Sequence, residues 1–486
     1  MSEFPGEQHH DPAPVRTPGG THRWPALLVC CSALFMTLLD VSITNVALPS
    51  ISDATGAGPS ELQWIVSGYT LTFGLVPVLA GRLGDDHGRK LVFQVGVVGF
   101  ALTSVMAGLA PTPELLIAAR VLQGVFGGLI NPQVSGLVQQ MFGPAERGRA
   151  FGALGTTVGV GVALGPMIGG LLIALGGPEL GWRLVFFVNV PVALVVLVLA
   201  RRLLPETPTA GRHRLDVGGA LLLGGATFCV LFAAVELEQL GPVVLALLAP
   251  GALLLLAFYR RERRLTRARH DPLVDLRLFR HGSYTSGVVL ALLYFPAQAG
   301  IPLVLTLFFQ RGLGYSALHT ALSVTAFAVG SAVAAQTAGR FVTRVGRPLT
   351  VAGTALFGVG AVGLAVAAHL APPDRAAYAM ALPLLVMGLG NGAVITPNQA
   401  LTLASVDPAV GSTAGGVLQT AQRVGLAVGQ AVIGAAFFAA VAGPGPASYA
   451  AALAVAVGVS LCFVTAATVV GVREVLRARR PASAFG

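Results

Sequence analysis

Three ionisable side chains lie inside long apolar runs of this sequence, namely Asp40, Arg120 and Arg423. A charge within the hydrocarbon core of a membrane is costly, and such residues usually serve the function of the protein. Burial raises the pKa of a carboxyl group toward the range in which a transported proton can bind and leave, and a nearby arginine lowers it again. Asp40 is therefore the candidate proton-binding group. The alternative is a structural carboxylate bonded to neighbours on its own helix, Ser42, Thr44 or Asn45.

Asp40 and Arg120 are expected at similar depth in the membrane. Asp40 lies roughly 21 Å along the first apolar run, and Arg120 lies roughly 9 Å below the outer edge of a core about 30 Å thick, on a run of opposite direction. We therefore predict that they share a cavity and form a proton-coupling pair. Different helix azimuths would keep them apart, and Arg120 could instead snorkel to the surface.

Amide side chains accompany these charges. Arg423 lies in the segment LQTAQRVGLAVGQ beside Gln419, and we expect it to face the bundle interior. Its role is either that of a structural hydrogen-bond donor or that of a contact for substrate or charge relay. The candidate substrate or relay contacts are Asn45, Gln123, Gln419 and Arg423.

The polar decapeptide GRLGDDHGRK, Gly81 to Lys90, separates two apolar runs. Its pattern of Gly-Arg, five residues and Gly-Arg returns in GRFVTRVGRP from Gly339. We expect both copies to be short tight turns at one membrane surface, with glycines where backbones crowd. Asp85 is placed to accept hydrogen bonds from the amino terminus of a neighbouring helix, and Arg82 and Arg89 to pair with acidic groups across the bundle. The second copy has no acid in its core, so a symmetric arrangement is not expected.

Glycines recur along the fifth apolar run, residues 150–175, at Gly155, Gly159, Gly161, Gly165, Gly169 and Gly170. Residues four apart share a helix face, so Gly161, Gly165 and Gly169 would let another backbone approach closely. Pro166 is expected to bend this helix. Generic packing of small residues is the alternative explanation.

Membrane-spanning helices must position these residues. The chain has 486 residues, of which 54% are hydrophobic and 11% charged, against about 25% charged in soluble domains. About 20 apolar residues cross the hydrocarbon core. Fourteen runs qualify: 26–48, 62–80, 91–110, 115–141, 150–175, 184–200, 217–235, 240–259, 283–309, 317–338, 349–370, 376–402, 412–440 and 449–470.

The basic residues predict the orientation of the chain. With the amino terminus inside, the cytoplasmic segments contain 26 Lys or Arg and the outer loops three. This bias places both termini in the cytoplasm and requires an even number of spans. Arginine greatly outnumbers lysine, of which Lys90 is the only example, as is typical of a high-GC bacterial genome and thus of an inner membrane.

The halves of the chain repeat a second feature. Ile130-Asn131-Pro132-Gln133 in the fourth span matches Ile395-Thr396-Pro397-Asn398 in the twelfth, each with a mid-helix proline and an adjoining amide. The predicted fold is thus an all-α membrane protein of 14 transmembrane helices, with two six-helix halves and two inserted central helices. Its predicted parts are a disordered cytoplasmic tail (1–24), a six-helix bundle (25–204), the inserted helices with a basic loop (205–282), a second six-helix bundle (283–470) and a cytoplasmic tail (471–486).

The chain resembles the fourteen-span drug:proton antiporters of the major facilitator superfamily. Five stretches in family order carry the resemblance: LLDVSITNVALPSI from Leu38, GRLGDDHGRK from Gly81, RVLQGVFGG from Arg120, GPMIGG from Gly165 and WRLVFFVNVPV from Trp182. The resemblance implies export of hydrophobic or amphipathic compounds, such as antibiotics, by alternating access driven by the proton gradient.

The resemblance also assigns roles to two motifs. It implies that the residues Gly81, Arg82, Gly84, Asp85, Gly88, Arg89 and Lys90 form a cytoplasmic gate latch that holds the outward-open state. It further implies that Gly161, Gly165, Pro166, Gly169 and Gly170 form the motif that marks antiporters. A proton, a small-molecule substrate and the lipid bilayer are the expected partners of a monomer.

Other functions receive less support. A transporter of one specific endogenous metabolite on the same fold remains the main alternative. A membrane-embedded enzyme would need a polar catalytic cluster at one surface, and the short loops contain none. The basic residues lie in short loops and not on one face of a domain, so nucleic acid is not an expected partner. Neither a metal nor a cofactor is expected, since the four cysteines lack ligand spacing and no GxxxxGK[ST] motif occurs.

We predict from the arginine distribution that tags at Met1, Gly211, His270 and Gly486 lie in the cytoplasm and that the loop at Asp53 is external. Labelling of single-cysteine variants in intact cells with an impermeant reagent tests this. External labelling at position 270 would contradict the fourteen-span topology.

Overall fold

Helices make up almost all of the protein. The computed structural model describes residues 22–206, 216–268, 270–443 and 445–479, so residues 1–21 of the predicted tail (1–24), the tag position Gly211 and residues 480–486 lie outside it. The described residues contain no strand. The α-helices are α1 (Arg23–Thr55), α2 (Pro59–Leu75), α3 (Pro77–His87), α4 (Arg89–Gly108), α5 (Pro113–Met141), α6 (Pro144–Phe187), α7 (Asn189–Leu203), α8 (Val217–Leu240), α9 (Leu248–Arg267), α10 (Gly282–Leu307), α11 (Ala317–Val345), α12 (Arg347–Leu370), α13 (Ala376–Ala404), α14 (Gly411–Ala440) and α15 (Pro446–Arg479).

The predicted number of spans agrees with this architecture. Among the described residues, twelve helices are long and apolar enough to cross a membrane, and two bent helix pairs raise the number to fourteen if each is one span. One pair is α2 with α3, bent by 47° next to Pro77. The other lies within α6, bent by 43° between Gly161 and Leu164. This second bend falls one turn before Pro166, where the proline ring disrupts helical bonding, as predicted.

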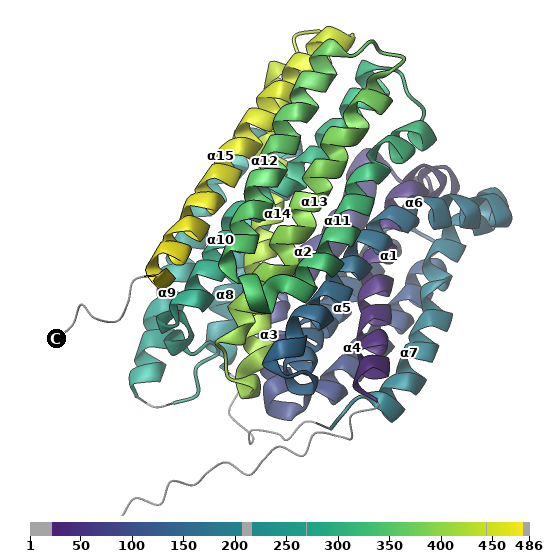
Figure 1. The fold of residues 1–486 in the computed structure, drawn as a ribbon. Helices are drawn as coiled ribbons and strands as arrows, with labels where there is room; N and C mark the ends of the chain where they lie inside the picture. The colour runs from purple at the N-terminus through teal and green to yellow at the C-terminus, as the bar shows by residue number, and fades with distance from the viewer. Residues whose placement is uncertain (1–21, 207–215, 269, 444, 480–486) are drawn as a thin grey trace, which may run out of the picture.

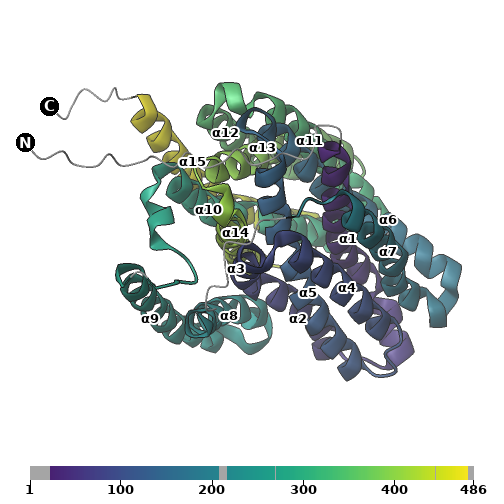
Figure 2. The same cartoon turned by 90° about the horizontal axis from the view of Figure 1, so that it is seen from below.

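The helices form two groups with an additional pair at the edge. Figure 2 shows α1–α7 on one side, α10–α15 on the other, and α8 and α9 side by side at the periphery. Helix α8 contacts both groups: Leu231 packs with Leu71 of α2 and Ala427 of α14, and Gln63 of α2 donates to the Val235 carbonyl at 3.2 Å. Helix α8 of the inserted pair therefore covers part of the seam between the two groups.

The expectation of two tight turns is wrong for most of both motif copies. Gly81–His87 belongs to α3, and only Gly88, at φ 101°, separates α3 from α4. The second copy is likewise helical up to Val345, and Gly346, at φ 69°, makes the turn. Arg82 and Asp86 form an ion pair at i, i+4 spacing that supports α3, whereas Asp85 and Arg89 pair across the turn at Gly88.

The first glycine of each copy makes a close contact between the two groups. A Cβ on Gly81 would collide with the backbone of Ser412 at the start of α14. A Cβ on Gly339 of α11 would collide with the Gly148 carbonyl of α6 and lie 2.9 Å from Gly152 Cα. We call the end of the bundle that contains these contacts, with Gly88 and Gly346, the basic end. Close backbone crossings thus join both groups at this end (Figure 1).

The recurring glycines of α6 lie against two neighbouring helices, α11 and α1. Toward the basic end, a Cβ on Gly159 would lie 3.3 Å from Ala332 of α11. Beyond the bend, a Cβ on Gly165 would collide with Ser42 of α1, and one on Gly169 would lie 3.3 Å from Ile43 Cα. Gly170 faces open space, with no atom within 4 Å. The close approach to α1 is therefore made at Gly165 and Gly169, and Gly170 does not share this contact.

Two segment boundaries differ from expectation. Helix α9 continues to Arg267 and so includes the first part of the predicted basic loop, while the segment before α10 forms only a short 3-10 helix, η2 (Leu276–Arg280). Charged side chains can extend a helix beyond the apolar run, which is why composition placed the boundary too early. Helix α15 similarly extends to Arg479, into the predicted tail.

We predict that Gly165→Leu abolishes export while Gly170→Leu retains it. A side chain at position 165 must displace α1 near Asp40, and overpacking of this kind typically costs about 1–3 kcal/mol, whereas position 170 has free space. Export from cells with matched amounts of inserted protein tests this. Equal activity of the two variants would favour generic packing of small residues over a specific contact at Gly165.

Candidate functional site

The Asp40 carboxylate is the centre of a buried polar cluster. It accepts hydrogen bonds from Arg120 Nη1 at 2.5 Å, Asn189 Nδ2 at 2.7 Å and Gln123 Nε2 at 3.0 Å. Ser104 Oγ in turn accepts from Gln123 at 2.8 Å. All five side chains are at most 1% exposed, and they come from α1, α4, α5 and α7. The expected contact between Asp40 and Arg120 is confirmed.

This arrangement differs from the structural alternative in its partners. Thr44 Oγ1 donates to the Asp40 backbone carbonyl at 2.7 Å and not to its carboxylate. Asn45 is exposed. The carboxylate instead bonds to other helices, so it holds α1 against α5 and α7. Asn189 and Ser104 were not among the predicted site residues; the amide in the apolar stretch VFFVNVPV was the signal available for Asn189.

Arg120 also faces a column of aromatic rings. Its Nε donates to the Ile65 carbonyl at 3.1 Å, and its Cζ lies 4.2 Å from the centre of the Tyr69 ring. Tyr69 stacks on Phe73 at 5.4 Å with an interplanar angle of 16°. Arg423 Cζ, from α14, lies 4.2 Å from the Phe73 ring centre. An arginine of each group thus bounds one pair of stacked rings, an attractive arrangement for both cations.

A cavity of about 180 Å³ lies between the two groups of helices. Its walls come from α1, α5 and α6 on one side and from α10, α13 and α14 on the other. The polar lining residues are Asn131, Ser135, Gln298, Thr396, Gln399, Gln419, Gln422 and Arg423. The apolar lining residues include Leu34, Leu38, Phe151, Phe295 and Leu426. A mostly apolar cavity with a few convergent polar groups is the usual form of a small-molecule site.

The four candidate contacts divide between these sites. Gln419 and Arg423 line the cavity. Gln123 belongs to the Asp40 cluster and is fully buried there. Asn45 lines neither site, because it lies on the exposed face of α1.

The repeated proline segments have equivalent places in the two halves. The residue before each proline, Asn131 or Thr396, lines the cavity. The amide after each proline bonds within its own group: Gln133 donates to the Ala80 carbonyl at 2.7 Å, and Asn398 donates to the Gly287 carbonyl at 3.0 Å. The repeat found in the sequence therefore corresponds to a repeated construction of the cavity wall.

Asp85 joins the two groups at the basic end. Its carboxylate accepts from Ser412 N at 3.2 Å and from Thr413 N and Oγ1, both at 2.8 Å. These residues lie in the first turn of α14, where free amides and the helix dipole favour a negative charge. The contact expected from the sequence is therefore confirmed.

The arginines of the motif pair locally, contrary to expectation. Arg82 pairs with Asp86 at 3.0 Å, and Arg89 pairs with Asp85 at 2.8 Å, so both acids lie on α3 itself. Arg89 nevertheless reaches the other group through the Pro408 and Ala409 carbonyls. Two further motif residues contact their own half: Lys90 bonds to Glu206 at 2.9 Å, and the missing side chain of Gly84 leaves space for Gln133.

The second copy of the motif obtains its acid from another helix. Arg347 pairs with Glu474 of α15 at 2.9 Å and donates to Asn398 Oδ1 at 2.7 Å. Its Nη2 also donates to the Ser283 carbonyl at 2.7 Å. These partners all belong to the carboxyl-terminal group, so this arginine stabilises one half and does not join the two.

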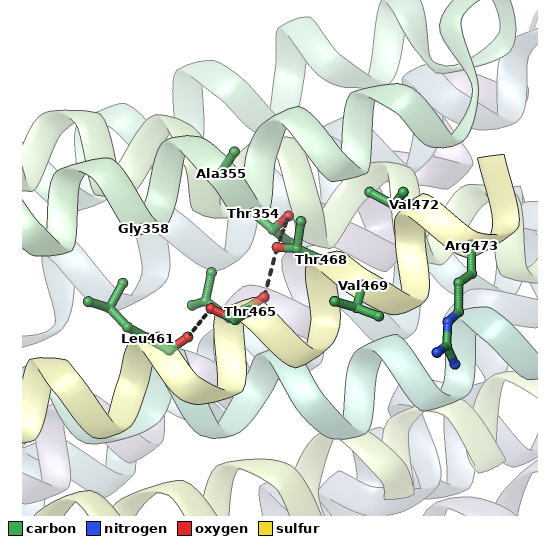
Figure 3. Close-up of a pocket in the computed structure, with 10 residues that line it drawn as sticks. Thr354, Ala355, Gly358, Leu461, Thr465, Thr468, Val469, Val472 and Arg473 are labelled. Atoms are coloured by element: carbon green, nitrogen blue, oxygen red, sulfur yellow. Dashed lines mark hydrogen bonds between the residues drawn. The ribbon is translucent and has the colours of Figure 1, made fainter. Parts of the chain in front are cut away.

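A second hollow of about 360 Å³ lies on the outside of the carboxyl-terminal group. Its lining residues belong to α12 and α15 alone, and Figure 3 shows Thr354 and Thr468 joined by a hydrogen bond, with Arg473 at one end. Because it does not touch the seam between the halves, it is not part of a pathway between them.

Comparisons with known proteins agree with this architecture. The family model described as "Major Facilitator Superfamily" matches residues 30–430. The chain is 37% identical to the "Probable actinorhodin transporter" of Streptomyces coelicolor over 88% of this chain and 75% of that protein. It is 36% identical to the "Puromycin resistance protein pur8" of Streptomyces alboniger, over 85% and 81% of the two chains. The "Tetracenomycin C resistance and export protein" of Streptomyces glaucescens is 32% identical, over 88% and 79%.

Solved structures share the fold at lower identity. The human organic anion transporter MFSD10 superposes with a TM-score of 0.67 at 17% identity, over 92% of this chain and 99% of that one. The proton:xylose symporter XylE gives a TM-score of 0.65 at 17% identity, over 92% and 94%. The family match across most of the chain, together with relatives that resist or export antibiotics, means that this protein belongs to the major facilitator superfamily of transporters.

Proposed function

We propose that the protein exports hydrophobic or amphipathic small molecules, such as antibiotics, across the cytoplasmic membrane in exchange for protons. The observation that carries this proposal is the fully buried Asp40–Arg120 ion pair within the amino-terminal half. An ionisable pair in lipid is rarely kept for stability alone, because removing charges from water costs more than most pairs regain. The names of the relatives support export as its purpose.

In this proposal the charge of Asp40 controls the conformation. When Asp40 is ionised, Arg120, Gln123 and Asn189 all donate to it and hold α1, α5 and α7 together. A proton on the carboxyl removes its charge and one acceptor site, so Arg120 is held less firmly. Only such a differential interaction can shift an equilibrium between two states. Arg120 rests on Tyr69, so its change is transmitted through Phe73 to Arg423, which lines the cavity.

The basic end is proposed to face the cytoplasm and to act as the inner gate. Asp85 and the Gly81 and Gly339 crossings all lie there and all join the two halves. Opening of the cavity toward the cytoplasm would require these contacts to separate. Alternating access then consists of breaking them while the outer ends of the two halves approach each other.

We predict that Asp40→Asn loses the pH dependence of export, while Arg120→Ala loses export itself. The asparagine cannot bind a proton, and alanine leaves the carboxylate buried without its cation. Proton-driven efflux is measured for both variants and the double variant in membranes with matched protein levels. Wild-type pH dependence in Asp40→Asn would refute the proton role.

The double variant tests whether the two residues act together. Independent sites add within about 0.5 kcal/mol. We expect the combined loss to be clearly smaller than the sum of the single losses, and additive losses would argue against direct coupling.

We predict that Asp85→Asn weakens the inner gate, with Asp86→Asn as its matched control. Hydrogen bonds to a charged group contribute about 1.5–3 kcal/mol, and Asp85 accepts two backbone bonds from α14, whereas Asp86 pairs with Arg82 on its own helix. Cysteine labelling at the basic end should therefore increase much more in Asp85→Asn. Equal labelling of the two variants would remove the gate role of Asp85.

A further inference from the structure

The cavity between the halves contains a single formal charge, and it is positive. None of the residues described as lining it is an Asp or Glu, while Arg423 lines it from α14. The other polar lining groups are hydroxyls and uncharged amides. A ligand in this cavity therefore meets the field of one cation at short range.

Arg423 is not neutralised by the protein around it. Within the described part of the chain, no carboxylate bonds to its guanidinium, which lies over the face of Phe73. A ring face provides only about 0.5–2 kcal/mol of attraction, far less than a carboxylate at the same depth. The acid of the neighbouring cluster, Asp40, is engaged by Arg120, Gln123 and Asn189. The guanidinium thus retains donors for an incoming anion.

The cavity also has hydrogen-bonding capacity to orient such a ligand. Asn131 Oδ1, Gln298 Oε1 and Thr396 Oγ1 are buried and have no protein partner among the described residues. Ser135, in contrast, already accepts from Gln419 at 3.2 Å. Buried acceptors without a partner are costly, so a ligand with hydroxyl or amide donors would satisfy them. Leu34, Phe151 and Phe295 supply apolar walls for a ring system.

We propose that the cavity selects aromatic compounds with one anionic group, a carboxylate or a phenolate, which binds Arg423. This inference rests on the proposed export function and specifies its substrate class. A guanidinium binds a carboxylate through two parallel hydrogen bonds, which fixes the orientation of the ligand. A cationic aromatic compound of the same shape would meet a like charge in a desolvated site, which disfavours it.

Two dyes of one skeleton test the charge directly. The methyl esters of fluorescein and of its diamino analogue share a xanthene ring system, and at neutral pH they have one negative and one positive charge, respectively. Energised inside-out vesicles contain wild-type protein, Arg423→Gln or Arg423→Lys, and Arg473→Gln is the control because Arg473 is exposed on α15 outside the cavity. Initial rates over a range of dye concentrations give kcat/KM for each dye.

We expect wild-type protein and Arg473→Gln to prefer the anionic dye by at least about tenfold, equivalent to about 1.4 kcal/mol. In Arg423→Gln this ratio should fall to about one, mainly through a higher KM for the anion, because uniform binding is lost. Arg423→Lys keeps the positive charge but loses the two parallel donors of the guanidinium, so it should retain part of the preference.

The outcomes separate this inference from the export proposal. Equal or preferred transport of the cationic dye by wild-type protein would overturn the anion preference and leave proton-driven export standing. An unchanged ratio in Arg423→Gln would equally overturn the role of Arg423. If wild-type protein in energised vesicles moves neither dye, export of aromatic compounds fails, and the inference fails with it. Should Arg423→Gln not insert, the wild-type ratio and fluorescence anisotropy of both dyes with purified wild-type protein still decide the charge preference.

Discussion

The need to neutralise the fully buried Asp40 organises the amino-terminal half. A carboxylate at this depth is tolerated only with a cation and further donors, and α5 and α7 supply them as Arg120, Gln123 and Asn189. Helix α1 must therefore remain close to both helices. Gly165 and Gly169 of α6 serve the same purpose, because they let α6 approach α1 within three residues of Asp40.

The basic end shows how one repeated frame is used in two ways. In both copies the first glycine makes a close crossing to the other half, and the glycine seven residues later, Gly88 or Gly346, turns the chain at positive φ. The acids differ: Asp85 bonds across the seam to α14, while Arg347 finds Glu474 within its own half. The backbone contacts are thus symmetric and the electrostatic contact is not.

The sequence predicted features that depend on local pattern and depth. The fourteen runs, the Asp40–Arg120 contact and the Asp85 contact to a helix terminus all followed from hydropathy, rise per residue and dipole direction. The sequence did not predict features that depend on the direction in which a side chain faces around its helix, or on a helix distant in the chain. Asn45 and Gln123 looked alike as intramembrane amides, but one is exposed and the other lies beside Asp40. The polarity of the Gly81 decapeptide predicts a turn, but most of it is helical, because Arg82 and Asp86 pair with each other at i, i+4 spacing within α3.

The two halves carry different charges, and the aromatic column connects them. The amino-terminal half has the ionisable pair, whereas the carboxyl-terminal half contributes the cavity cation Arg423. Tyr69 and Phe73 separate the two guanidinium groups, and Leu231 of α8 packs against Gly74 in the same helix α2. Helix α2 therefore contacts Arg120 of the Asp40 cluster, Arg423 of the cavity wall and helix α8. A small rotation of α2 would move both ring faces at once, so a displacement of Arg120 would also change the surroundings of Arg423.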